Sequence, residues 1–132
     1  MHYLLDTNIC IYIIKKHPIK VLNRLRQQSV GEVAVSSITL AELEYGADKS
    51  SRPEQNRNAL LSFLSPLEIL AFDEMAALHY GEIRAYLEKT GKIIGAMDML
   101  IAAHARSISL TLVTNNTKEF SRIPNLNLEN WV

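Results

Sequence analysis

The segment HYLLDTN, residues 2–8, opens the chain with a short apolar run that stops at three polar residues. An apolar run of this length followed by a polar turn is typical of a buried strand, and an aspartate in such a turn often caps a helix. Apolar residues from Ile9 onward predict that helix. The first unit of the chain is therefore expected to be a strand leading directly into a helix, with Asp6 at the junction.

The same order of strand and helix recurs through the rest of the sequence. Short apolar runs predict further strands over residues 33–35, 67–72 and 110–113, and the tail at 126–131 allows one more. Helices are predicted from residue 18, over 37–46 with Ser37 as N-cap, and over 53–65, 73–91 and 96–106. This alternation predicts a single domain over residues 1–132, a three-layer α/β/α sandwich with a mostly parallel central sheet.

Composition describes an ordinary globular chain and leaves its partners open. Hydrophobic residues make up 48% and charged residues 21% of the 132 positions, and 14 basic residues balance 14 acidic ones. Net charge therefore neither indicates nor excludes a nucleic-acid partner. No run approaches the roughly 20 apolar residues that span a bilayer, and the N-terminus lacks the basic region of a signal peptide. The single cysteine, Cys10, excludes an internal disulfide, so a cytoplasmic protein without a membrane partner is expected.

Three acidic residues fall where a parallel sheet would bring them to one edge. Asp6 ends the first predicted strand, Glu42 lies on the helix after the second, and Asp98 lies one turn into a helix that follows Gly95. In such folds ligands gather beyond the carboxyl ends of the strands. Converging carboxylates repel unless a cation lies between them, and oxygen ligands without a His or Cys cluster favour Mg²⁺ or Mn²⁺. A site of this kind suits phosphodiester hydrolysis.

Each of these acids also has an ordinary structural explanation. Asp6 can serve only as a helix cap, Glu42 as a solvent-facing helix residue, and Asp98 as a charge that favours a helix N-terminus. His104, flanked by alanines, is expected to pack within its helix rather than to bind a metal. Spacing alone leaves these alternatives open.

Four short blocks follow one another along the chain. They are Leu5-Asp6-Thr7-Asn8, the stretch from Ser36-Ser37 to Glu42-Leu43 and Gly46, the stretch from Gly95 to Asp98 with residues 101–105, and Thr114-Asn115-Asn116. Together they resemble the PIN domain, and in particular the VapC toxins of bacterial toxin–antitoxin pairs. The resemblance runs from about residue 3 to the C-terminus. It implies a ribonuclease that requires Mg²⁺ or Mn²⁺, with Asp6 and Asp98 as metal ligands and Glu42 completing the acidic cluster.

The resemblance also implies a fourth acidic position and a set of supporting residues. Many relatives carry an aspartate where this chain has Asn116, whereas a subgroup of these toxins uses an acid that resembles Glu119. Glu119 is therefore expected to be the fourth acid, with Asn116 as a supporting contact. The residues expected to orient the ligands are Thr7, Asn8 and Ser37. The candidates for phosphate binding are Lys15, Lys16, Arg84 and Arg106.

By the same resemblance, a metal-activated water would attack the scissile phosphorus of an RNA, with initiator transfer RNA the leading candidate. The chain would form a homodimer, be inhibited by a VapB-type antitoxin within a higher hetero-oligomer, and reach DNA only through that antitoxin. Two alternatives stand beside this hypothesis: a PIN-like interaction module without activity, and a receiver-type signalling domain. The second needs adjacent acids after the first strand, where this chain has Asp6 alone.

Overall fold

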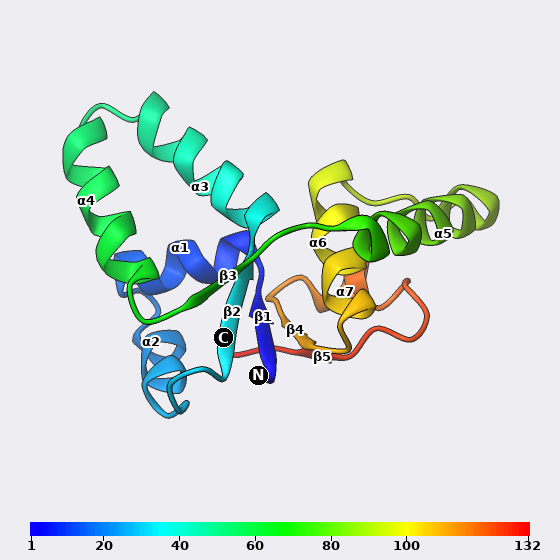
Figure 1. Ribbon diagram of the computed structural model, residues 1–132, viewed down its shortest axis with the longest axis horizontal. Coiled ribbons are helices and arrows are strands. Elements are labelled where there is room, and N and C mark those ends of the chain that lie inside the picture. Colours follow the sequence, from blue (N-terminus) through cyan, green and yellow to red (C-terminus); the bar gives the residue numbers. More distant parts are fainter.

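The computed structural model describes residues 1–132 and consists of a five-stranded sheet covered by seven helices (Figure 1). The strands are β1 (Tyr3–Leu5), β2 (Val33–Ser36), β3 (Glu68–Leu70), β4 (Thr111–Val113) and β5 (Leu128–Glu129). The helices are α1 (Thr7–Lys15), α2 (Ile19–Arg26), α3 (Ser37–Lys49), α4 (Pro53–Leu64), α5 (Glu74–Thr90), α6 (Ala96–Ser107) and α7 (Thr117–Phe120). The short helix α7 is an element that the sequence analysis missed. None of the helices has the length and apolar character needed to cross a membrane.

All neighbouring strands of the sheet run parallel, in the order β3-β2-β1-β4-β5. Leu4 of the central strand β1 lies beside Ala34 of β2 and Leu112 of β4. The tail forms the edge strand β5, in which Leu128 pairs with Leu112. The predicted parallel sheet is confirmed, and the carboxyl ends of its strands lie at one edge.

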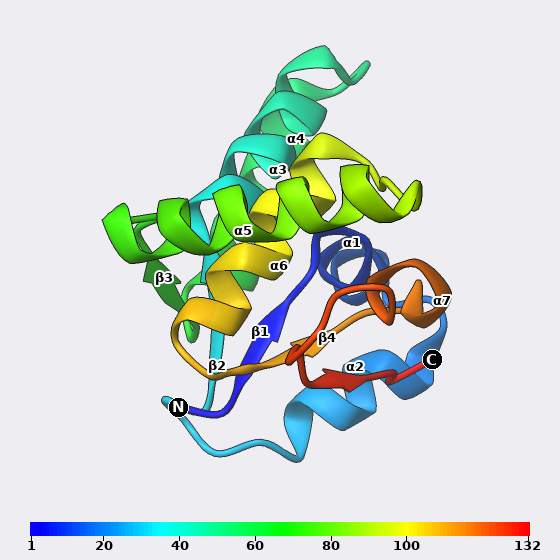
Figure 2. The ribbon, with the colours of Figure 1, turned by 90° about the vertical axis from the view of Figure 1, so that its right-hand side faces the viewer.

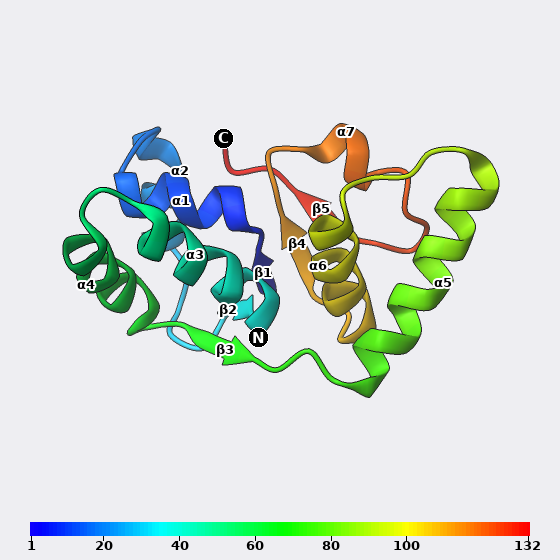
Figure 3. The same cartoon turned by 90° about the horizontal axis from the view of Figure 1, so that it is seen from above.

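Side chains alternate between the two faces of the sheet and fill a separate core on each. Leu4 and Ala34 are buried in the core that includes side chains of α5, α6 and α7. Their neighbours Leu5 and Val35 are buried in the core that includes side chains of α1 to α4. Figure 2 shows the α5–α6 pair in front of the strands, and Figure 3 shows α1, α3 and α4 on the opposite side of the sheet. The predicted three-layer sandwich is confirmed, because helices cover both faces of the parallel sheet.

Aspartates at the ends of extended segments set where two of the helices begin. Asp6 Oδ1 accepts a hydrogen bond from Ile9 N at 2.9 Å, so α1 begins at Thr7, two residues earlier than predicted. Asp73 Oδ1 accepts from Ala76 N at 3.0 Å and caps α5, as predicted. Each carboxylate therefore satisfies a backbone N–H that the first turn of a helix leaves unpaired.

The N-cap of α3 is Ser36, and the prediction of Ser37 was wrong. Strand β2 extends one residue further than predicted, because Ser36 pairs with Leu70 of β3. Ser36 keeps the extended backbone that an N-cap needs, and its Oγ accepts from Ile38 N at 3.0 Å. Ser37 Oγ instead accepts from Phe72 N at 3.0 Å and fastens the segment after β3.

Helix α3 continues past Gly46, where the sequence predicted its end, as far as Lys49. Gly46 does not adopt the positive φ of a helix end, in contrast to Gly91, whose φ of 70° ends α5 as predicted. Leu43 and Ala47 are both buried and lie one turn apart on α3. Packing of these side chains outweighs the low helix propensity of the glycine between them.

Candidate active site

Asp6 lies at the carboxyl edge of the sheet, between β1 and α1. It is 4% exposed, and its backbone N donates to Val113 O at 3.0 Å. Its carboxylate accepts hydrogen bonds from Ile9 N at 2.9 Å and from the Thr114 hydroxyl. Asp6 therefore does cap α1, as its ordinary explanation predicted. The cap occupies only Oδ1, so it does not exclude a second role for the carboxylate.

Burial raises the pKa of Asp6 from its usual 3.8 to about 6. The hydrogen bonds from Thr114 and Ile9 stabilise the carboxylate and lower the pKa, whereas the charges of Asp98 and Glu42 raise it. Desolvation outweighs the two hydrogen bonds. A carboxylate that is ionised at neutral pH but has lost most of its water is stabilised by a nearby cation.

Asp98 reaches the same region from the first turn of α6. Its carboxyl is partly buried, and its pKa is raised first by desolvation, then by Glu42 and then by Glu119. Gly95, the N-cap residue of α6, lies beside this carboxyl, and a β-carbon there would meet Asp98 Oδ2 at 3.4 Å, in ordinary van der Waals contact. Asp98 is thus linked electrostatically to acids on α3 and α7.

Glu42 comes from α3 and is held by the first residue of α1. The Thr7 hydroxyl donates to Glu42 Oε1 at 2.5 Å. Thr7 Oγ1 also lies 3.4 Å from Oγ1 of the buried Thr39, one turn before Glu42 on α3. Glu42 is only partly exposed and is fixed at this position, so it is not the freely solvated helix residue of the ordinary explanation.

The structure therefore couples the four acids named from the sequence pair by pair through their charges. The charges of Asp98 and Glu42 raise the pKa of Asp6, and the charges of Glu42 and Glu119 raise the pKa of Asp98. They come from four separate segments, namely the β1–α1 junction, α3, α6 and α7. Because neighbouring carboxylates raise one another's pKa, the cluster is strained electrostatically in the absence of a cation.

The donor set of this cluster fits Mg²⁺ or Mn²⁺. All four side chains offer hard carboxylate oxygens, and the one buried histidine, His104, bonds elsewhere. No group of three Asp, Glu, His or Cys side chains lies close enough together to hold an ion as the side chains stand. The geometry is thus an open cluster of repelling carboxylates rather than a closed cage of ligands.

Only some of the residues expected to orient the metal ligands lie at the acidic cluster. Thr7 bonds Glu42, but Ser37 bonds Phe72 N after β3, and Asn8 is exposed and makes no side-chain hydrogen bond. Asn116 precedes α7, and its backbone N donates to Thr114 Oγ1 at 2.9 Å.

Thr114 is the contact that the sequence analysis missed. It is buried at the end of β4, and its hydroxyl joins Asp6 to the turn that leads to Glu119. Its place in the last sequence block, directly after a strand, was the signal that could have identified it.

The four candidate phosphate-binding cations also differ in their surroundings. Arg84 bonds Glu88 and Tyr80 on its own helix. Arg106 bonds His79 Nδ1 at 2.8 Å and lies 3.6 Å from Glu82, at the end of α6 opposite Asp98. Lys15 and Lys16 at the end of α1 form no ion pair.

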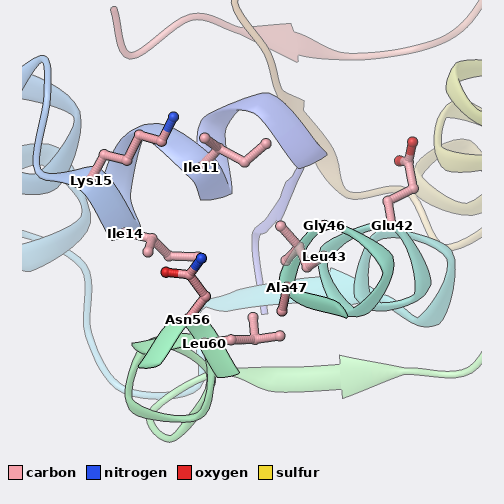
Figure 4. A pocket seen from close by; sticks show the side chains of 9 residues that line it. All are labelled: Ile11, Ile14, Lys15, Glu42, Leu43, Gly46, Ala47, Asn56 and Leu60. Atoms are coloured by element: carbon pink, nitrogen blue, oxygen red, sulfur yellow. The ribbon is translucent and has the colours of Figure 1, made fainter. Parts of the chain in front are cut away.

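A groove of about 320 Å³ begins beside Glu42 and runs between α1, α3 and α4 (Figure 4). Its lining residues are Ile11, Ile14, Lys15, Glu42, Leu43, Gly46, Ala47, Asn56 and Leu60. Figure 4 shows Lys15 and Glu42 on opposite sides of Ile11, with aliphatic side chains below them. The groove is therefore an apolar channel with one charge of each sign at its rim.

His104 on α6 is buried against its neighbours, as predicted, and connects that helix to β2. Its Nδ1 lies 2.8 Å from Ser36 Oγ, and the Phe72 ring meets the imidazole edge to face. Burial lowers the pKa of His104, an effect opposed by Asp73. Since Ser36 caps α3, this buried contact joins the helix that carries Asp98 to the start of the helix that carries Glu42.

Comparison with known proteins agrees with this geometry. The PIN domain family matches residues 3–126. The chain belongs to the PIN-domain family. Ribonuclease VapC2 of Rickettsia felis is 54% identical to this PIN domain, over 99% of the chain and 98% of that protein. The tRNA(fMet)-specific endonuclease VapC of Shigella flexneri is 46% identical, over 99% and 98% respectively.

Solved structures lead to the same family. The crystal structure of DNA-bound VapBC from Salmonella typhimurium matches this PIN domain with a TM-score of 0.95 at 45% identity, covering 100% of the chain and 99% of that one. The resemblance to VapC proteins and the assignment to the nuclease class of enzymes are therefore confirmed. The receiver-type alternative is excluded, because a PIN domain covers nearly the whole chain.

Proposed function

We propose that this chain is the toxin of a toxin–antitoxin pair, an endoribonuclease that uses Mg²⁺ or Mn²⁺ bound by Asp6, Glu42 and Asp98. The observation that carries the proposal is the electrostatic coupling of these three carboxylates, two of which have raised pKa values. Carboxylates that repel one another at the carboxyl edge of a parallel sheet form a site for a divalent cation and a phosphate ester. The whole chain, residues 1–132, would act as one PIN domain.

In this mechanism Asp6 and Asp98 would hold the ion, and Glu42 would bind it directly or through a water. Once bound, the ion would supply an activated water and would neutralise charge that develops on the phosphate. Ile9 N and the Thr114 hydroxyl fix the Asp6 carboxylate, and the Thr7 hydroxyl fixes that of Glu42. Such bonds hold ligands in the orientation that the reaction needs. Glu119 is the proposed fourth acid, with Asn116 as its neighbour.

For the substrate we propose initiator transfer RNA. The support is that the relatives from Shigella flexneri and Salmonella typhimurium, 46% and 45% identical, are named tRNA(fMet)-specific endonucleases. A cytoplasmic location follows from such a substrate and agrees with the single cysteine.

For partners we propose a VapB-type antitoxin that inhibits the enzyme, and a homodimer within a larger assembly that reaches DNA only through the antitoxin. The support is that related structures are VapBC complexes, two of them with DNA. The apolar groove beside Glu42, rimmed by Lys15, suits an antitoxin segment laid between α1, α3 and α4.

The test is cleavage of initiator transfer RNA by the purified chain with Mg²⁺ or Mn²⁺, with and without EDTA. We expect cleavage by the wild type, abolition by EDTA, and a loss of a hundredfold or more in Asp6→Asn and Asp98→Asn, since even outer contacts of a metal site are worth about 10- to 100-fold. Asp73→Asn is the matched control, because it alters an exposed carboxylate that only caps a helix. Undiminished cleavage by either site variant, or in EDTA, would refute the assignment.

Two further results distinguish the remaining alternatives. A wild type that cleaves no RNA with either metal would indicate the inactive interaction module. Glu119→Gln compared with Asn116→Ala decides the fourth position, and we expect the larger loss of activity from Glu119→Gln.

A further inference from the structure

A second hollow, of about 400 Å³, lies between α7 and the loop that joins α5 to α6. It is lined by Gly91, Lys92, Ile93, Lys118 and Arg122. Figure 3 shows α7 beside this loop, at the opposite end of the molecule from α2 and α4. We call it the α7 hollow. None of its three cations was named from the sequence as a candidate for phosphate binding.

The charge of the α7 hollow is entirely positive. Its three ionisable side chains are Lys92, Lys118 and Arg122, no acid lines it, and none of the three forms an ion pair. Arg84 and Arg106, by contrast, are each compensated by a glutamate. Three uncompensated cations around one hollow repel one another and attract an anion.

The position of the α7 hollow connects it to the acidic cluster. Lys118 and Arg122 lie on either side of Glu119 in the sequence, and the charge of Glu119 acts on Asp98. Arg122 Nη1 also donates to Ile93 O at 3.5 Å, in the loop that leads into α6 and Asp98. The hollow therefore borders the helix that carries Glu119 and the loop that leads to Asp98, while Lys15 lies in the groove beside Glu42.

We infer that the α7 hollow binds the phosphodiester backbone of the RNA substrate next to the phosphate that is cleaved. The inference rests on the proposed function. An acidic cluster repels an RNA strand, so the adjoining nucleotides need positive charge close to the site. Lysine and arginine side chains that meet only phosphates bind without regard to base sequence. Lys92, Lys118 and Arg122 are thus backbone contacts rather than residues that select the base.

The test compares two triple variants of equal charge. One is Lys92→Gln, Lys118→Gln and Arg122→Gln. The matched control is Lys20→Gln, Arg26→Gln and Lys49→Gln, which removes three exposed cations that form no ion pair from α2 and the end of α3. Binding of initiator transfer RNA is measured in an Asp98→Asn background over a range of salt concentrations, and cleavage is measured in the otherwise wild-type chain.

For the hollow variant we expect a slope of log Kd against log salt concentration that is smaller by about 2, at about 0.7 per lost phosphate contact, and a KM that rises on the order of tenfold. The control variant should change little. Arg122→Lys, which keeps the charge but not the guanidinium bond to Ile93 O, should bind RNA as the wild type does.

An unchanged salt slope in the hollow variant would overturn the inference, as would an equal change in the control variant. Normal RNA binding with loss of binding to a VapB-type antitoxin would also overturn it and would assign the hollow to a protein partner. If the wild type cleaves no RNA, the proposed function fails. The binding measurement alone then tests whether the α7 hollow binds the RNA backbone.

Discussion

Replacing Asp6 by asparagine should raise the free energy of unfolding at pH 8 when no divalent metal is present. Asp6 is 4% exposed, and burial raises its pKa from 3.8 to about 6, so the folded chain holds an ionised carboxylate in a poorly solvated place. Asparagine has nearly the same shape and keeps an oxygen that can accept the hydrogen bond from Ile9 N. The substitution therefore removes the charge and retains the cap of α1.

The expected gain follows from the pKa difference between the folded and unfolded chain. A pKa raised from 3.8 to about 6 corresponds to a penalty of about 3 kcal/mol for the ionised form, at about 1.4 kcal/mol per pKa unit. Below about pH 4 the carboxyl of the wild type is protonated in both states and no penalty arises. As the pH rises to about 6, the unfolded chain releases its proton first, so the wild type loses stability.

Asparagine does not titrate, so the advantage of Asp6→Asn should grow from near zero at about pH 3.5 to about 3 kcal/mol above about pH 7. Urea unfolding followed by circular dichroism at several pH values, in EDTA, measures this difference. Asp73→Asn is the control, because Asp73 makes the same kind of cap to Ala76 N at 3.0 Å but is exposed. It should bring no gain at high pH.

Addition of Mg²⁺ should make the wild type more stable to unfolding than Asp6→Asn. A ligand that binds only the folded chain stabilises it, and the variant lacks a carboxylate of the proposed site. The reasoning is refuted if Asp6→Asn in EDTA is less stable than the wild type at pH 8, or if its advantage is the same at about pH 4 as at pH 8.

Two other predictions concern the same edge of the sheet. Ser36→Ala removes the cap of α3 and the partner of His104, so urea unfolding should reveal a free energy of unfolding lower by about 1–3 kcal/mol. Ser37→Ala loses only its bond to Phe72 N and should lower the free energy of unfolding less. An equal decrease in the two variants would contradict this prediction. RNA cleavage activity should fall as the pH drops through about 6, where Asp6 takes up its proton. The midpoint of this fall should move to lower pH as the Mg²⁺ concentration is raised, because metal and proton compete for one carboxylate. A midpoint that is independent of the Mg²⁺ concentration would argue against Asp6 as a ligand.

Much of the fold could be predicted because local spacing carries the information. Each strand is a short apolar run that ends at polar residues, and each long helix shows apolar residues at helical intervals. Asp73 and Gly91 at the two ends of α5 were identified correctly, since the residue types alone favour a cap and a left-handed turn. The short helix α7 was missed, because four residues are too few to display a period.

The errors fall where a neighbour distant in sequence decides between adjacent residues. Ser36 and Ser37 are equally good caps by type, and pairing of Ser36 with Leu70 of β3 selects the first. Packing of Leu43 and Ala47 carries α3 through Gly46. Neither contact can be recognised from residues within one turn of the position concerned.

The sequence by itself determined the parallel α/β architecture, the places of Asp6, Glu42 and Asp98 after strands or in early helical turns, and the family resemblance. These follow from short-range patterns and residue types. Only the tertiary structure decided how those acids are held and which cations accompany them. Thr7 reaches Glu42, Thr114 reaches Asp6, and the glutamates on α5 neutralise two arginines, leaving the cations of the α7 hollow uncompensated. Hydrogen bonds and charge interactions act over a few ångströms in space, and the fold alone sets which distant residues come within that range.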